Sequence, residues 1–303
     1  MERRAFLKGV NLLAAAAGMG GAWAQAPSPK GVQGGGFYRF PLGRYTVTVL
    51  SDGQSAPGPL LPSWGANPEL QEEFRRVLLE HFLDPNATPN NFNPVLVDTG
   101  SARLLVDTGR GQGGRLLEHL ALAGYAPGDL THVFLTHGHP DHIGGLVDGG
   151  GRPAFPNALH LMGRVDLDYW LKNPTPAVER ALFPLRERIR PVEDGEEILP
   201  GVRAVASFGH TPGHMSLEVL SEGQKLFIFG DAAGHYLLSL RFPQAYLGFD
   251  MDRAQVVATR ARLFRKVAEE KALLTAYHFP WPALGYLRPL GEGYEFVPAF
   301  FRF

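Results

Sequence analysis

The sequence predicts an α/β fold in which two mixed β-sheets are packed between helices. Segments with strand composition alternate with segments of helical periodicity along most of the chain, which is typical of layered α/β proteins. Glycine and proline are frequent, with 37 and 25 residues, and they predict many structured loops. Histidine and aspartate residues follow four of the predicted strands, which favours a site at one edge of the fold.

The N-terminal half supplies the first group of predicted elements. Residues 45–50 are rich in β-branched side chains and predict a strand. Pro68 and Glu69 mark the start of a helix, because apolar residues then recur at helical spacing. Further strands are predicted over residues 94–97, 103–106 and 131–135, and a helix over residues 115–123 that Gly124 ends.

The C-terminal half continues this alternation. Asp252 is a typical helix cap, and the helix after it is predicted to extend to about residue 270. Residues 164–195 are rich in charged residues, aromatic residues and proline, and they predict a helical insert near the site. No break in composition divides the chain, so residues 44–303 are expected to form one domain. Strands are predicted over residues 159–162, 202–207, 216–220 and 225–229, with 272–277 as the last.

The bulk composition limits the classes of function. Of the 303 residues, 45% are hydrophobic and 19% are charged, which is typical of a globular protein. The formal net charge is −1 and no long basic segment is present, so no nucleic-acid partner is expected. The chain contains no cysteine. Any bound metal must therefore be held by nitrogen and oxygen atoms alone.

The first 24 residues have the pattern of an export signal. Arg3 and Arg4 begin a segment that resembles the twin-arginine motif, and an apolar stretch over residues 10–23 follows. Cleavage is expected after Ala24, which ends a small-residue pattern, and residues 25–43 are expected to form a leader. No later segment is apolar enough to span a bilayer. We therefore expect an exported protein, periplasmic or extracellular, without a stable membrane span.

The most informative segment is residues 136–142, in which three histidines and one aspartate lie close together. Without a partner, these side chains would repel one another when protonated and would cost desolvation free energy when buried. A bound cation removes both problems, because zinc prefers imidazole nitrogen and carboxylate oxygen, with manganese, iron and cobalt as competitors. The ligand candidates in this segment are His137, His139, Asp141 and His142.

Three more ligand candidates each follow a later predicted strand, namely His210, Asp231 and His278. Strand ends converge on one edge of a layered α/β fold, so seven side chains would meet there, enough for two divalent cations. Only Asp141 and Asp231 carry a formal charge, so two dications would keep surplus positive charge. That surplus is expected to lower the pKa of a bridging water and to yield hydroxide.

This motif set resembles the metallo-β-lactamase superfamily over most of the chain that follows the signal. The resemblance implies a four-layer αββα sandwich. It also implies that Asp231 bridges two metals and that Asp107, in the second Asp-Thr-Gly, supports the site from behind. His214 is expected to orient its loop by hydrogen bonding. The implied ligands are His137, His139 and His210 for the first metal, and Asp141, His142 and His278 for the second.

The C-terminal segment resembles the methyl parathion hydrolase branch of that superfamily. This resemblance implies an exported dinuclear enzyme acting on lactones, aryl esters or organophosphate triesters, and it suggests a homodimer. Hydrolysis of neutral, fairly apolar esters, above all lactones or aryl esters, is the leading hypothesis, with Asp141, Asp231 and a metal-bridging hydroxide as the catalytic groups. The similar stretches are residues 36–40, 249–252, 276–285 and 293–298.

Two alternative functions remain open. One is hydrolysis of thioesters, as in glyoxalase II-like enzymes, or of β-lactams. The other is a non-catalytic metal-binding protein, against which the complete ligand set argues. An apolar substrate pocket is expected near the metals, and its candidate lining residues are Trp170, Trp281, His235, Phe92 and Phe183.

Overall fold

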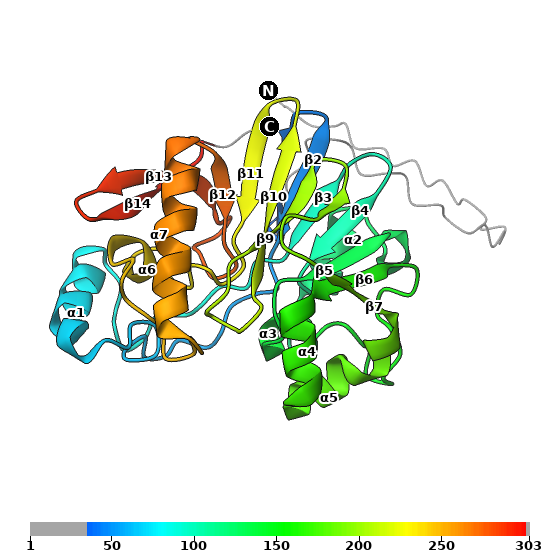
Figure 1. The fold of residues 1–303 in the computed structure, drawn as a ribbon, viewed down its shortest axis with the longest axis horizontal. Helices are drawn as coiled ribbons and strands as arrows, with labels where there is room; N and C mark the ends of the chain where they lie inside the picture. The colour runs from blue at the N-terminus through cyan, green and yellow to red at the C-terminus, as the bar shows by residue number, and fades with distance from the viewer. Residues whose placement is uncertain (1–34, 301–303) are drawn as a thin grey trace, which may run out of the picture.

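The computed structural model describes residues 35–300, which form two seven-stranded sheets (Figure 1). The first sheet has the order β1-β2-β3-β4-β5-β6-β7. Its first four strands pair antiparallel, whereas β5, β6 and β7 each pair parallel to the preceding strand. The strands are β1 (Phe37–Leu42), β2 (Tyr45–Leu50), β3 (Val95–Asp98), β4 (Arg103–Val106), β5 (His132–Leu135), β6 (Leu159–Gly163) and β7 (Ile189–Val192).

The second sheet has the order β14-β13-β12-β11-β10-β9-β8. All its pairs are antiparallel except β11 with β12, whose carboxyl ends therefore lie at the same edge. This parallel pair matters for the site, because two of the ligand candidates, Asp231 and His278, follow β11 and β12. The strands are β8 (Glu197–Leu199), β9 (Val202–Ala206), β10 (Met215–Ser221), β11 (Gln224–Ile228), β12 (Leu273–Thr275), β13 (Leu284–Leu290) and β14 (Gly293–Pro298).

Helices cover the outer face of each sheet (Figure 1). The longest, α7, follows Asp252, whose side chain accepts a hydrogen bond from the backbone N–H of Gln255, so the predicted cap is confirmed. The α-helices are α1 (Gln71–Glu80), α2 (Leu116–Leu122), α3 (Pro140–Ile143), α4 (Arg164–Lys172), α5 (Pro176–Ala181), α6 (Leu238–Arg241) and α7 (Arg253–Glu269). The 3-10 helices are η1 (Pro68–Leu70), η2 (Pro127–Asp129) and η3 (Phe183–Arg188).

Three apolar clusters separate the layers. The cluster between the sheets contains Val47 and Val97 from the first and Leu217 from the second, all fully buried. A second cluster joins the outer face of the first sheet to α2, α4 and α5, and a third joins the second sheet to α7. Because each sheet buries both faces, the order of layers is helix, sheet, sheet, helix. The predicted αββα sandwich is confirmed.

Several predicted boundaries are wrong. Residues 37–42, assigned to the leader, form β1 and pair with β2 over six positions. The predicted insert 164–195 is helical only as far as residue 188, after which β7 pairs with β6. These two strands each contain a proline and lie at the two edges of the first sheet, where a missing N–H is tolerated. The short strand β8 was not predicted either. Strand 272–277 is not the last, because β13 and β14 form a hairpin after it.

The predicted signal peptide at residues 1–24 lies outside the described residues. Within residues 35–300, the structure contains no helix with the length and apolar composition that crossing a membrane requires.

His160 on β6 is buried in a way that the sequence did not indicate. Its side chain is fully buried, and neither ring nitrogen has a hydrogen-bond partner within residues 35–300. Burial, together with the nearby Arg188 cation, lowers the pKa of His160 to about 4. Because the unfolded chain binds the proton with a pKa near 6.5, His160 favours the folded state above about pH 6.5. This contribution is lost as the pH falls from about 6.5 to about 4.

We expect the substitution His160→Leu to reduce the acid sensitivity of folding. Between pH 7 and pH 4.5 the variant should lose about 2 kcal/mol less unfolding free energy than the wild type, because it has no imidazole to protonate. Urea unfolding of both proteins, each stripped of metal with a chelator, measures this difference. Equal losses in the two proteins would show that His160 is not the responsible group.

Candidate metal centre

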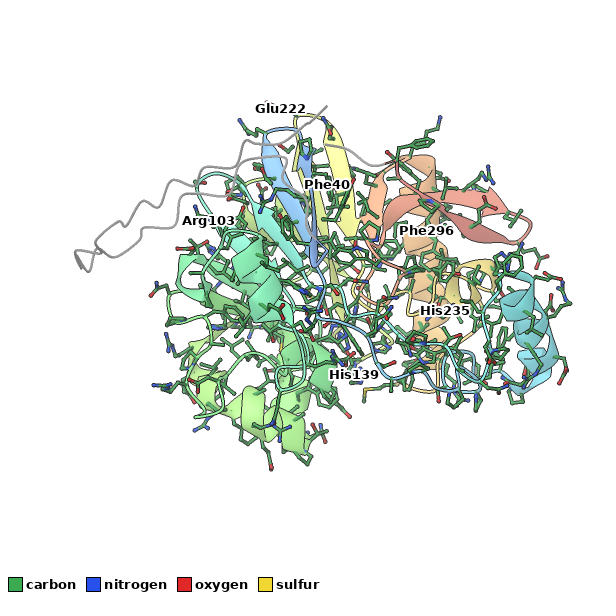
Figure 2. All side chains as sticks on the ribbon, turned by 180° about the vertical axis from the view of Figure 1, so that it is seen from behind. Phe40, Arg103, His139, Glu222, His235 and Phe296 are labelled. Carbon is green, nitrogen blue, oxygen red and sulfur yellow. The ribbon has the colours of Figure 1, made fainter. Side chains whose placement is uncertain are left out.

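The candidate site lies where strand ends from both sheets meet. Figure 2 shows His139 at the junction between the part built on the first sheet and the part built on the second. His137 and His139 follow β5, and Pro140 starts α3, the short helix that carries Asp141 and His142. The other three candidates follow β9, β11 and β12 and are His210, Asp231 and His278.

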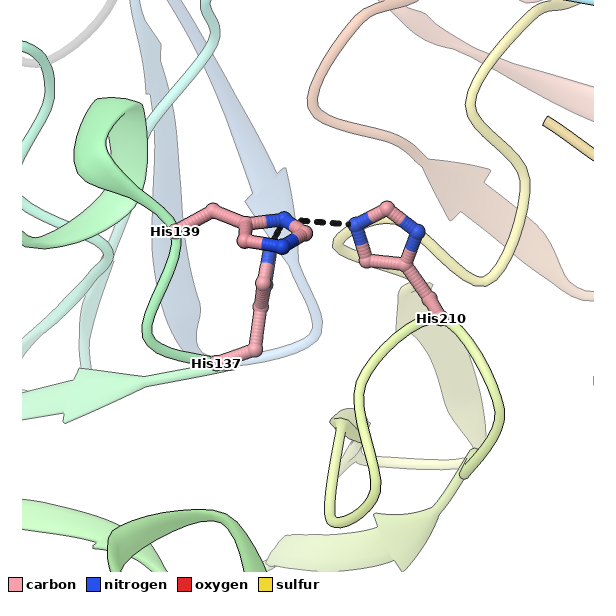
Figure 3. A group of neighbouring side chains, drawn as sticks. All are labelled: His137, His139 and His210. Atoms are coloured by element: carbon pink, nitrogen blue, oxygen red, sulfur yellow. Dashed lines mark hydrogen bonds between the residues drawn. The ribbon is translucent and has the colours of Figure 1, made fainter. Parts of the chain in front are cut away.

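The first group of ligand atoms consists of three imidazole nitrogens (Figure 3). Nδ1 of His139 lies 3.0 Å from Nε2 of His137 and 3.0 Å from Nε2 of His210. Two of these residues follow a strand of the first sheet, and the third follows a strand of the second. The group therefore exists only because the two sheets are packed in this arrangement.

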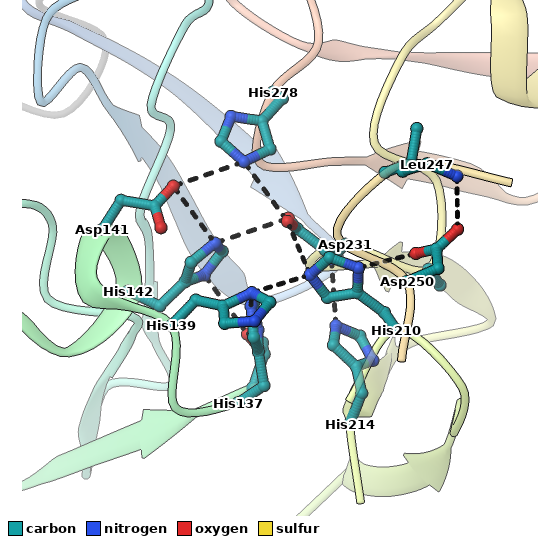
Figure 4. A network of polar contacts seen from close by, with 12 residues as sticks. His137, His139, Asp141, His142, His210, His214, Asp231, Leu247, Asp250 and His278 are labelled. Carbon is teal, nitrogen blue, oxygen red and sulfur yellow. Dashed lines mark hydrogen bonds and ion pairs between the residues drawn. The ribbon is translucent and has the colours of Figure 1, made fainter. Parts of the chain in front are cut away.

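Asp231 lies at the centre of the remaining ligand candidates (Figure 4). Its carboxylate oxygens are 3.5 Å from Nε2 of His142, 3.3 Å from Nε2 of His210 and 3.3 Å from Nε2 of His278. Asp141 completes the cluster, 3.7 Å from His142 and 3.4 Å from His278. The structure thus brings together all seven residues that the sequence suggests as ligands. They form three overlapping groups, and the ligand atoms of each group lie within 4.8 Å of one another.

In three of the imidazoles, Nδ1 points away from the other ligand candidates, and its hydrogen bond determines which ring nitrogen carries the proton. Nδ1 of His142 lies 2.8 Å from a carboxylate oxygen of Asp107, and Nδ1 of His210 lies 2.8 Å from one of Asp250. Nδ1 of His278 lies 2.8 Å from the carbonyl oxygen of Asn91. Each acceptor requires an N–H at Nδ1, so each Nε2 keeps a lone pair directed into the site.

The donor set fits divalent cations. Nε2 of His142 and one oxygen of Asp231 are buried and have no hydrogen-bond partner within residues 35–300. Leaving such an atom unpaired costs about 1–3 kcal/mol, and a cation between the two atoms would satisfy both. Five imidazoles and two carboxylates give nitrogen and oxygen ligands in numbers that suit two metal ions.

Burial keeps two imidazoles of the first group, those of His137 and His139, neutral. Burial and the neighbouring imidazoles lower the pKa of His137 well below its usual value and lower that of His139 to about 3. Burial opposes ionisation of Asp231, but the facing His278 and His142 hold its pKa well below the usual range. His137 and His139 therefore offer neutral nitrogens, and Asp231 an ionised carboxylate, at neutral pH, which are the forms that bind metal. Although burial opposes it, the facing carboxylates raise the pKa of His142 and of His278, so these two rings would release a proton when a cation binds.

Asp107 and His214, predicted to support the site, lie directly behind it. Asp107 accepts hydrogen bonds from the backbone N–H of Thr136, at 2.8 Å, and from His142. Nε2 of His214 accepts a 2.9 Å bond from the backbone N–H of Asp231, and its Nδ1 lies 2.8 Å from the hydroxyl of Ser207. Burial lowers the pKa of His214 to about 3, so a neutral ring can accept this bond.

A cavity of about 290 Å³ opens onto the ligand candidates. Phe92, predicted to line it, does so, with its ring 5.5 Å from that of His278. Trp64 and Phe249 also line it and were not predicted. The Trp64 ring lies 5.3 Å from Phe249 and 5.0 Å from His278, each in an edge arrangement. These three aromatic side chains form the apolar wall of the cavity.

The other four predicted lining residues do not line this cavity. Trp170 is buried behind His139, where its indole N–H donates to Asp166. Phe183 packs against the helices of the first sheet, and Trp281 packs against the cluster between the sheets. His235 is buried and its Nδ1 accepts two backbone N–H groups at the start of α6. His235 therefore stabilises a helix end, and its assignment to the pocket is wrong.

Two buried carboxylates that touch the site were not predicted. Asp250 lies in a stretch noted only for its resemblance to relatives, yet it accepts the bond from His210. Asp166 binds the loops that carry His137 and His210 through their backbone N–H groups. Sequence spacing gives no signal for either contact, because both residues are distant from their partners along the chain. The only sign close in sequence is the acidic residue itself, at a helix start or in a turn.

Comparisons with known proteins agree with this geometry. The profile of the Metallo-beta-lactamase superfamily matches residues 87–275. The N-acyl homoserine lactonase AiiA of Bacillus thuringiensis subsp. kurstaki is 27% identical over 246 residues, which cover 80% of this chain and 92% of that protein. The atrochrysone carboxyl ACP thioesterase dmxR1 of Cryptosporiopsis sp. is 34% identical over 148 residues, 47% of this chain and 39% of its own.

Two solved structures resemble the whole described fold. AidC, a dizinc quorum-quenching lactonase in complex with a product N-hexnoyl-L-homoserine, aligns with a TM-score of 0.80 and 26% identity over 88% of this chain and 98% of its own. The hydrolase AbOPH of the beta lactamase superfamily aligns with a TM-score of 0.81 and 25% identity over 89% of this chain and 100% of its own.

Proposed function

Because the chain belongs to the metallo-beta-lactamase superfamily and is a metal-dependent hydrolase, we propose that it opens the ring of N-acyl lactones. One observation carries the choice of substrate. The cavity is lined by five of the seven ligand candidates, and it has an aromatic wall on one side and these carboxylates and imidazoles on the other. A neutral lactone with an apolar acyl chain matches both sides.

Two divalent cations, with zinc as the proposed identity, would lower the pKa of water toward neutrality and withdraw electrons from a carbonyl oxygen. His137, His139 and His210 would hold the first cation, and Asp141, His142 and His278 the second, with Asp231 shared. Asp141 is the more accessible carboxylate, with 27% of its side chain exposed against 6% for Asp231. Asp141 is therefore placed to take a proton from the attacking water and to pass it to the ring oxygen as the C–O bond breaks.

The aromatic wall is suited to the acyl chain. Trp64, Phe92 and Phe249 face the cavity from three separate segments, and 42% of Phe249 is exposed to solvent. Each methylene transferred from water to such a wall gains about 0.8 kcal/mol. The lactone ring would then lie against the ligand candidates, and the chain would extend toward Trp64 and Phe249.

A second candidate is a thioester substrate. The fungal thioesterase relative has the higher identity, 34% against 27% for the lactonase, but over 148 residues against 246. Aryl esters and organophosphate triesters would suit the same cavity as secondary substrates, because they are also neutral and apolar.

We also propose export through the twin-arginine route, supported by Arg3 and Arg4 and by the small-residue pattern that ends at Ala24. A homodimer is proposed from the resemblance to the methyl parathion hydrolase branch. Fractionation of expressing cells, and light scattering of the purified protein, test these two points separately.

A substrate panel tests the proposed function. A sample loaded with two equivalents of zinc is given an N-acyl lactone, an aryl ester, a phosphotriester, a thioester and a β-lactam. We expect kcat/KM for the lactone to exceed that for the β-lactam by at least about a hundredfold. If only the thioester or the β-lactam is hydrolysed, the assignment to lactones is wrong. A sample that binds metal but hydrolyses none of the five would support a non-catalytic role.

The substitution Trp64→Ala tests the role of the aromatic wall. For a lactone with a long acyl chain we expect kcat/KM to fall by about tenfold, because part of the wall is lost. For a lactone with a two-carbon chain the change should be less than about twofold. The short lactone is thus an internal control on the same protein. An equal fall for both lactones would mean that Trp64 supports the site and does not bind the chain.

A further inference from the structure

The first group of ligand candidates depends on the relative position of two loops. The loop with His137 and His139 follows β5 of the first sheet, and the loop with His210 follows β9 of the second. A shift of either loop by about 1 Å would disturb the nitrogen spacing of 3.0 Å that the group shows. The contact that fixes one loop against the other therefore affects how well the group binds metal.

The side chain of Asp166 makes the side-chain contact of this kind, beside a 2.9 Å backbone bond in which the N–H of Met215 donates to the carbonyl oxygen of Thr136. Asp166 lies in the first turn of α4 and is fully buried. One of its oxygens accepts a 3.0 Å hydrogen bond from the backbone N–H of Gly138, between the two histidines of the first loop. Its other oxygen accepts a 3.0 Å bond from the backbone N–H of Gly213, three residues after His210. A single carboxylate thus joins both loops.

The two loops and α4 pack closely around Asp166. A Cβ atom at Gly138 would lie 2.4 Å from the Trp170 ring, and one at Gly213 would lie 2.1 Å from the backbone nitrogen of Asp166. The indole N–H of Trp170 donates a 2.9 Å bond to the Asp166 oxygen that Gly138 also uses. The Trp170 ring is 5.7 Å from the His139 ring. The two glycines and the tryptophan therefore hold the carboxylate in one position.

We propose that Asp166 is a positioning residue that joins the two sheets across the first ligand group, and that it sets the metal affinity of that group. It does not face the cavity and does not touch the other group, which consists of Asp141, His142 and His278. The proposal uses the metal-binding part of the proposed function and is independent of the substrate. A failure to hydrolyse lactones would leave it intact.

The substitution Asp166→Asn tests this proposal with little change in volume. An amide keeps one acceptor oxygen, but its NH₂ group must face one of the loop N–H groups, so one loop is released. The variant is made in two backgrounds: His278→Ala, which leaves the first ligand group complete, and His139→Ala, which leaves the second. Release of zinc to a coloured chelator is timed in each, and total zinc is measured by mass spectrometry.

We expect Asp166→Asn to speed zinc release about 10–100-fold in the His278→Ala background and less than about threefold in the His139→Ala background. Asp168→Asn, an exposed position on the same helix, should change neither rate. Equal rates with and without Asp166→Asn, or equal acceleration in both backgrounds, would overturn the proposal. If the Asn variant does not fold, Trp170→Phe removes one donor and should accelerate release in the His278→Ala background only.

Discussion

The substitution Asp231→Asn is expected to lower kcat/KM for the lactone by about a thousandfold, equivalent to about 4 kcal/mol of transition-state stabilisation. Asp231 is the carboxylate that lies within 3.5 Å of three imidazoles, and an amide in its place removes one of the two negative charges in the cluster. Asp141, which belongs to the second cation's ligands, would then be the single carboxylate among the ligand candidates. We therefore also expect the bound metal to fall from two equivalents to one or fewer.

Steady-state kinetics and elemental analysis of the same samples measure both effects. Asp168→Asn serves as a matched control, because it makes the same chemical change at an exposed site on α4. Thermal unfolding of the metal-free proteins separates loss of metal from loss of the fold. A variant that keeps two equivalents of metal and at least a tenth of the wild-type kcat/KM would contradict a shared ligand at Asp231.

The positions of the ligands could be predicted because each ligand is adjacent in sequence to the strand that carries it. His137 comes two residues after β5 and Asp231 three residues after β11, so the strand and its ligand are recognised together. The rule that strand ends meet at one edge then supplies the long-range arrangement. Layer order followed in the same way from the alternation of strands and helices.

Two of the missed strands, the edge strands of the first sheet, have a common physical cause. Pro41 interrupts the pattern of β1, and Pro191 interrupts that of β7. Proline is unfavourable within a ladder of hydrogen bonds, and it is tolerated in these two strands because they are the first and last of their sheet. An edge position is a property of the assembled sheet, and a single strand does not reveal it.

The aromatic wall and the supporting acids could not be predicted for a different reason. Trp64 and Trp281 have similar surroundings in sequence, rich in proline, yet only Trp64 lies at the cavity. Asp250 contacts a histidine that lies 40 positions earlier in the chain. Such contacts depend on how loops pack over the finished sandwich, and hydrophobic periodicity carries no information about them.

The guanidinium of Arg260 in α7 connects the stability of the fold to the site. Arg260 is fully buried; its Nε donates a 2.9 Å bond to the carbonyl oxygen of Ala232, next to Asp231, and another of its nitrogens donates to the carbonyl oxygen of Ala245. A third nitrogen lies 3.4 Å from the Asp250 carboxylate. Hydrogen bonding by His210 and the charge of Arg260 hold the pKa of Asp250 below its usual range, although burial opposes this.

The substitution Arg260→Met is expected to lower the unfolding free energy by about 3–5 kcal/mol. Methionine fills much of the volume, but it leaves the Asp250 charge buried without its cation and leaves two buried carbonyl oxygens without donors. Urea unfolding of the metal-free protein measures the loss. Arg265→Met, an exposed position on the same helix, should change the unfolding free energy by less than about 0.5 kcal/mol.

A double substitution distinguishes the cost of the unpaired Asp250 charge from the cost of the two unpaired carbonyl groups. If the unpaired charge of Asp250 is the main cost, adding Asp250→Asn to Arg260→Met should recover about 1–3 kcal/mol, because the amide carries no charge. The double variant should nevertheless bind metal more weakly than the wild type, since His210 then loses its carboxylate partner. If the double variant recovers no unfolding free energy, the loss in Arg260→Met comes from the two carbonyl groups left without donors. A loss below about 1 kcal/mol for Arg260→Met alone would contradict a buried ion pair that stabilises this part of the fold.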